Sequence, residues 1–182
     1  MDSLIYILPL AGSIALAFTF IRSSWVSRQE VGDSRMERIA TNIADGAMAF
    51  LKAEYRVLAI FVAAIAVLLA IKGANEEASN VWVAISFVVG AICSALAGFI
   101  GMRVATKANV RTTNAARTSL GKALEVAFAG GSVMGLGVVG LGVLGLGLMI
   151  ILYKALDFGN DGAAMAYAEM NVVLNVISGF SL

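Results

Sequence analysis

The fold class of this protein is decided by residues 126–153, which read VAFAGGSVMGLGVVGLGVLGLGLMIILY. This stretch contains no charged side chain, and it is followed at once by Lys154. A helix of about 20 apolar residues is long enough to cross the hydrocarbon core of a bilayer. The stretch therefore predicts a transmembrane helix, and the rest of the chain repeats the pattern.

Further long apolar runs lie on both sides of this stretch, and the last of them is interrupted only by Glu169. The whole chain of 182 residues is 60% hydrophobic and 14% charged, with a mean hydropathy of +0.89. A water-soluble domain would not have this balance. We therefore expect an all-α fold, a single transmembrane domain over residues 1–182 that forms a polytopic bundle of about five helices. Their expected ranges are 3–24, 45–72, 78–107, 122–154 and 162–182.

The second helix is expected to continue an amphipathic helix. Residues 34–51 place Met36, Ile39, Ile43 and Leu51 at helical spacing before the apolar run begins. The charged side chains at 52–56 can lie at the membrane interface, where long side chains extend toward water.

The distribution of basic residues predicts the topology. Six of the 13 basic residues lie between Arg22 and Arg56, and five lie between Arg103 and Lys122. The positive-inside rule makes these two regions cytoplasmic and places the N-terminus outside. A cleaved signal peptide is the alternative for the first run, because Ala15-Leu16-Ala17 resembles a cleavage site. The charges around that run have the reverse order of a signal peptide, so we expect an uncleaved span.

Several kinds of chemistry are excluded by composition. The chain has no histidine and a single cysteine, Cys93, so His-ligated metal sites, Cys-His nucleophiles and intrachain disulfides are ruled out. Its 12 acidic residues are scattered along the sequence. Several Mg²⁺ ions would need a cluster of carboxylates, and no such cluster is visible on any one predicted helix.

Glycines are concentrated in the fourth predicted helix. At 100° per residue, one face carries four of them, and Gly140 and Gly147 lie on the opposite face. The four on the first face are Gly131, Gly135, Gly142 and Gly145. A phosphate-binding loop would follow a strand and end in Gly-Lys-Ser/Thr, and neither feature is present. We therefore expect these glycines to allow close helix packing from two sides.

Polar groups near the predicted spans offer few candidate sites. The basic stretch from Arg103 to Lys122 is typical of a loop at lipid headgroups, and an anionic substrate is its alternative partner. Glu169 is expected either to reach water at the interface or to line an ion path. Asn175 and Ser178, one turn apart on the last helix, are better placed to line a polar conduit.

Three strings together resemble the membrane-integral inorganic pyrophosphatases. They are GAMAFLKAEYR at 46–56, GFIGMRVATKANVRT at 98–112 and AFAGGSVMGL at 127–136, and the closing SGFSL at 178–182 looks like the fifth helix of that family. The resemblance implies a dimeric pump of the cell membrane, in bacteria the inner membrane, that hydrolyses Mg²⁺-bound pyrophosphate and moves protons or sodium ions outward. Some members of the family also need K⁺, and none of these roles involves nucleic acid.

The same resemblance divides roles among the residues. Asn175, Ser178 and Leu182 fall on positions like those that line the ion's exit route and its hydrophobic gate. The first four helices resemble the scaffold around the inner helices. The family's Asp-rich and Lys-containing substrate motifs are absent here. We therefore expect an N-terminal segment of a larger pump that is inactive by itself.

Two other functions remain open from the sequence. One is a small non-enzymatic membrane subunit that assembles through the glycines of the fourth helix. The other is a small secondary transporter. This hypothesis is weaker, because no inverted repeat is visible among the predicted helices.

Overall fold

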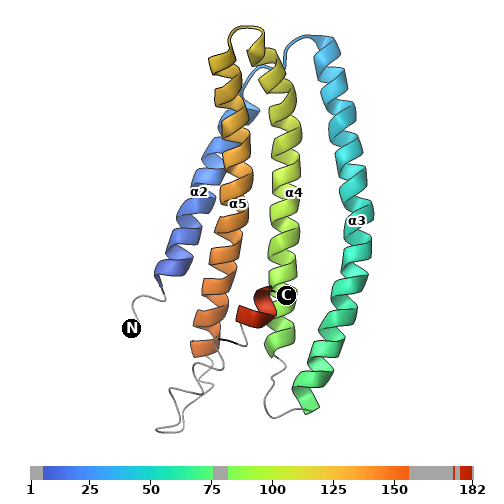
Figure 1. Ribbon diagram of the computed structural model, residues 1–182, viewed down its shortest axis with the longest axis vertical. Helices are drawn as coiled ribbons and strands as arrows, with labels where there is room; N and C mark the ends of the chain where they lie inside the picture. Colours follow the sequence, from blue (N-terminus) through green and yellow to red (C-terminus); the bar gives the residue numbers. More distant parts are fainter. Residues whose placement is uncertain (1–5, 76–81, 156–173, 175–176, 182) are drawn as a thin grey trace. The chain divides into compact units, whose positions relative to one another are not determined.

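A computed structural model describes residues 6–75, 82–155, 174 and 177–181 of the chain. Its long elements are α2 (Ile7–Ser27), α3 (Ser34–Asn75), α4 (Trp82–Ala116) and α5 (Leu120–Ala155) (Figure 1). All four are long and apolar enough to cross a membrane, and the described residues contain no strand. The expected all-α polytopic bundle is confirmed. Of the fifth expected span, only residue 174 and residues 177–181 are described, and these are helical.

Two helices are longer than the apolar pattern alone indicated. The amphipathic stretch and the second span form one continuous helix, α3, as expected. Its 42 residues extend over about 63 Å. Helix α4 continues nine residues past the expected end at 107 and stops at Ala116. The basic stretch from Arg103 to Lys122, expected to contain a loop, is therefore mostly helical, and residues 117–119 alone connect α4 to α5.

The chain divides into two compact units, which are described separately. Unit 1 comprises Met1–Gly12, Val57–Ser94 and Gly142–Leu182, and unit 2 comprises Ser13–Arg56 and Ala95–Leu141. By sequence, unit 2 holds eleven basic and six acidic residues, a net charge of +5, whereas unit 1 holds two basic and six acidic residues, a net charge of −4. Nearly all the positive charge is thus gathered in one unit.

The connections in unit 2 have clear local causes. Gly32 has a φ of +101°, which side chains with a Cβ rarely adopt, and the chain turns there between α2 and α3. Asp33 then caps α3, since its Oδ1 accepts a hydrogen bond of 3.0 Å from the Met36 backbone N–H. Ser119 caps α5 in the same way, with a 3.2 Å bond from the Lys122 N–H to its Oγ.

The core of unit 2 brings α2, α4 and α5 together. Val26, Ala108 and Ala129 form a buried cluster, and Trp25 packs against it. Helix α3 contacts α4 through Tyr55, whose hydroxyl donates a 2.6 Å hydrogen bond to the Ala95 carbonyl. These contacts use small residues on α4 and α5, as expected for helices that associate within a membrane.

The core of unit 1 is a second cluster. Met149 and Tyr153 of α5 are buried, and four partly buried side chains pack against them. These are Trp82 and Val89 of α4, Ile150 of α5 and Phe180. The rings of Trp82 and Tyr153 meet edge to face, with centroids 5.5 Å apart and planes inclined at 70°.

Candidate helix-packing and ion-path residues

The predicted ion-path residues fall on the last segment of the chain. Ser178 is exposed, and its carbonyl accepts a 3.1 Å hydrogen bond from the Ser181 hydroxyl one turn later. Asn175 and Leu182 lie outside the described residues, as does Glu169. The role of these residues in an ion path stays a prediction.

Residues 177–181 are held against α4 by unusually close backbone contacts within unit 1. A Cβ atom on Gly90 would collide with the Phe180 carbonyl oxygen, and one on Gly179 would lie 2.6 Å from the Val83 carbonyl oxygen. Glycine is needed at both positions because no side chain fits between the two backbones. Sequence reasoning did not single out these two glycines. The available signal was the pair Ser86 and Gly90, two small residues one turn apart on an apolar helix.

Ser86 is a buried polar residue beside this segment. It is fully buried, and within the described part of the chain its hydroxyl has no hydrogen-bond partner. A Cβ on Gly179 would lie 3.2 Å from the Ser86 Cβ, so the hydroxyl is close to the segment that carries Ser178. Thr19 of α2 is the comparable case in unit 2: it is buried, and its Oγ1 has no partner among the described residues.

The four glycines predicted to pack helices have different surroundings. A Cβ on Gly145 would lie 2.9 Å from Cys93 Sγ and from the Phe180 ring. On Gly131, Gly135 or Gly142 it would meet no atom of the described chain within 4 Å. Gly145 therefore packs closely within this chain. For the other three, a packing role stays a prediction, and it would need a neighbour that is not among the described residues.

The opposite face of α5 packs against α2. In unit 2, a Cβ on Gly140 would lie 3.0 Å from Leu16 Cδ2, and in unit 1 one on Gly147 would lie 2.8 Å from Pro9 Cδ. Toward α4, a Cβ on Gly130 would lie 2.7 Å from the Ala108 Cβ. Helix α5 is thus approached closely by α2 and α4, whereas Gly131, Gly135 and Gly142 have no neighbour within 4 Å in the described chain.

A polar network closes the end of unit 2 where α2 meets α3. Arg111 of α4 donates hydrogen bonds of 3.0 Å to the Gln29 carbonyl, 3.1 Å to the Ser27 carbonyl and 2.9 Å to the Lys107 carbonyl. The first two acceptors lie at and just after the C-terminal end of α2, where helical carbonyls have no partner within the helix. Arg111 therefore stabilises the end of α2 from a neighbouring helix.

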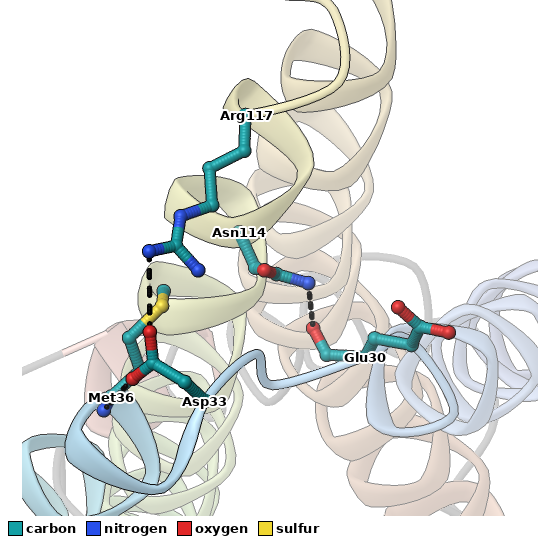
Figure 2. A network of polar contacts seen from close by, with 5 residues as sticks. All are labelled: Glu30, Asp33, Met36, Asn114 and Arg117. Atoms are coloured by element: carbon teal, nitrogen blue, oxygen red, sulfur yellow. Dashed lines mark hydrogen bonds and ion pairs between the residues drawn. The ribbon is translucent and has the colours of Figure 1, made fainter.

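The network continues into the turn after α2. Asn114 donates a 3.3 Å hydrogen bond to the Glu30 carbonyl, and Arg117 pairs with Asp33 at 3.2 Å (Figure 2). The pKa of Asp33 is lowered from its ordinary value, first by the Met36 backbone N–H and then by Arg117. Both partners of the ion pair are well exposed, so the pair adds little stability by itself.

The described residues were compared with the requirements of a metal site. Among the residues that the structure describes, no group of three or more Asp, Glu or Cys side chains lies close enough to hold a metal ion.

Comparison with known proteins identifies the family. A family model described as inorganic H⁺ pyrophosphatase matches residues 13–182. The chain belongs to this family. The resemblance found in its sequence strings is confirmed, and it extends over the packed helices of both units.

Individual relatives include both sodium and proton pumps. A protein of Clostridium tetani, named provisionally as a K⁺-stimulated pyrophosphate-energized sodium pump, is 52% identical over 136 residues, which cover 75% of this chain and 19% of the relative. A K⁺-insensitive pyrophosphate-energized proton pump of Methanosarcina mazei is 42% identical, covering 86% and 23%. A K⁺-stimulated pyrophosphate-energized sodium pump of Thermotoga maritima is 40% identical, covering 83% and 20%. The chain thus spans about a fifth of the length of the curated relatives it matches.

Proposed function

We propose that this chain forms the first helices of a membrane pump that couples the hydrolysis of inorganic pyrophosphate to the outward movement of protons or sodium ions. The family match over residues 13–182 carries the proposal. Relatives named as proton and as sodium pumps are similarly identical to the chain, so either ion fits.

Within such a pump, helices α2 to α5 serve as scaffold. Their buried contacts are made by small and apolar side chains, and their polar network lies at the end of unit 2. Ser178 is proposed to line the ion path, together with Asn175 and Leu182. The substrate and its Mg²⁺ would be held by other parts of the complete protein, which we propose to be a homodimer of the bacterial inner membrane. A K⁺ requirement is consistent with the names of some relatives.

The orientation follows from charge. Unit 2 carries the net charge of +5, and its basic residues lie toward the end of α2, in the first part of α3, in the last part of α4 and the turn after it, and at the start of α5. The positive-inside rule places that end in the cytoplasm and the start of α2 outside.

The proposed function is tested by comparing residues 1–182 with the product of the complete reading frame in which they lie. Each is expressed in a host without pyrophosphatase pumps, and Mg²⁺-dependent phosphate release and ion uptake are measured in membrane vesicles. We expect both activities from the complete product and neither from residues 1–182. If the complete product released no phosphate, the proposal would be wrong. Hydrolysis by residues 1–182 alone would refute their assignment as scaffold.

A further inference from the structure

Two cations of α4 have no acidic partner among the described residues. Arg103 and Lys107 are both exposed, and neither forms an ion pair within the part of the chain that the structure describes. Arg111, one turn further on, is different, because its guanidinium is occupied by three backbone carbonyls. Helix α4 itself contains no Asp or Glu. The two cations are therefore available to an anionic partner.

The surroundings of the two cations are apolar on one side and polar on the other. The Arg103 guanidinium lies 5.5 Å from the centre of the Phe99 ring, and Phe99 is 37% exposed. On the other side, the Lys107 ammonium group is 3.5 Å from the Ser27 hydroxyl of α2. Leu96 lies three residues before Phe99 on α4, and its side chain is also exposed, at 48%.

These four residues of α4 form one stripe. At 100° per residue, Leu96, Phe99 and Lys107 all lie within about 40° of the direction of Arg103. At 1.5 Å per residue, the stripe from position 96 to position 107 is about 16 Å long. Half of a bilayer core is about 15 Å thick. Along the helix, the stripe thus changes from exposed apolar to exposed cationic over about the depth of one leaflet.

We propose that this stripe binds an anionic phospholipid, with the phosphate between Arg103 and Lys107 and an acyl chain along Phe99 and Leu96. A planar guanidinium and an ammonium group both pair well with a phosphate. Free phosphate or pyrophosphate would use the cations alone, whereas the exposed Leu96 and Phe99 on the same face match a ligand with a hydrocarbon part. The lipid preference does not depend on the orientation or the activity proposed above.

Lipid binding is tested by native mass spectrometry of the detergent-purified chain titrated with phosphatidylglycerol or phosphatidylcholine. We expect the chain to prefer phosphatidylglycerol. The pair Arg103→Gln and Lys107→Gln should weaken phosphatidylglycerol binding about tenfold or more, since each basic residue near an anionic surface is worth about 1 kcal/mol. The charge-matched pair Arg38→Gln and Lys122→Gln, also exposed in unit 2, should change it less than twofold. The swap of Arg103→Lys with Lys107→Arg should retain most of the binding.

Three results would overturn the proposal. The first is equal binding of the two lipids, and the second is an equal loss in both glutamine pairs, which would indicate nonspecific attraction to the net charge. The third is displacement of phosphatidylglycerol by inorganic phosphate at similar concentration, which would indicate a site for a soluble anion. All four exchanged side chains are exposed, so circular dichroism should give unchanged helix content.

A second measurement locates the lipid without removing either cation. Phe99→Trp, combined with Trp25→Phe and Trp82→Phe, leaves a single tryptophan beneath the Arg103 guanidinium. In mixed vesicles, its fluorescence should be quenched more strongly when the brominated chains are on phosphatidylglycerol than when they are on phosphatidylcholine. Equal quenching by the two lipids would contradict the proposed position.

Discussion

Replacing Gly147 by alanine tests whether glycine contacts hold α5 against α2. The new Cβ would lie 2.8 Å from Pro9 Cδ and 3.0 Å from the Pro9 nitrogen, which belong to a rigid ring and its backbone. Neither atom can move without moving α2, and overpacking of this kind costs about 1–3 kcal/mol. Alanine also gains about 1 kcal/mol of helix propensity over glycine. Gly135→Ala has the same gain but no contact within 4 Å among the described residues, which makes it the matched control.

The difference in the free energy of unfolding between Gly147→Ala and Gly135→Ala reports the contact with Pro9 alone, because the gain in helix propensity is the same in both variants. We expect Gly147→Ala to be less stable than Gly135→Ala by about 1–3 kcal/mol, which corresponds to a melting temperature lower by roughly 2–12 °C for a chain of this size. Gly140→Ala should fall between them, since the end of the Leu16 side chain can move aside. Thermal unfolding in detergent, followed by circular dichroism, gives the order. Equal melting temperatures for the Gly147 and Gly135 variants would refute the reasoning.

Three other predictions concern unit 2. Tyr55→Phe removes the 2.6 Å hydrogen bond to the Ala95 carbonyl and should lower the stability to denaturation in detergent by about 0.5–1.5 kcal/mol, whereas an unchanged midpoint would show that the bond contributes nothing. Arg111→Gln should speed hydrogen exchange of the amides at the end of α2, with Arg111→Lys intermediate and Arg38→Gln without effect; equal exchange in all three would contradict the capping role. Because the pKa of Asp33 is lowered, its contribution to the cap of α3 is present above its ordinary value of 3.8 and lost as the pH falls through the lowered pKa. As the pH falls, the protection factors of the amides at the start of α3, which compare their exchange with the intrinsic rate at the same pH, should therefore fall more in the unsubstituted chain than in Asp33→Asn.

The sequence predicted the spans better than their ends. Apolar runs are set by the thickness of the bilayer, so the fold class could be predicted from composition and run length. Where α4 ends depends instead on contacts with other elements. The charged stretch after 102 looked like a loop because its apolar residues stop, yet Arg103, Lys107 and Arg111 are spaced four residues apart, which is helical spacing. Lys107 and Arg111 contact the end of α2. These contacts depend on how the helices pack, so the sequence of α4 alone did not predict them.

Helical geometry predicted which glycines of α5 share a direction, but it could not say which neighbour, if any, lies against each of them. Gly140 and Gly147 share a face, and both meet α2. Gly145 meets α4 and the last segment, although it was grouped with three glycines that the described chain leaves open. A period of 100° per residue fixes the directions of residues around one axis, whereas the identity of the neighbours depends on how the other helices pack.

Burial on α5 also follows a different rule from that of a soluble helix. Phe128 is 74% exposed and Val139 is 57% exposed, whereas Gly137 and Gly140 are buried. In water such an arrangement would be costly, but a lipid chain is as apolar as phenylalanine, so exposing large apolar side chains in a membrane costs little. Close backbone approach then supplies the main attraction between helices, and small residues permit it. For this reason hydrophobicity located the helices of this chain, while its glycines and alanines determine which of their faces meet.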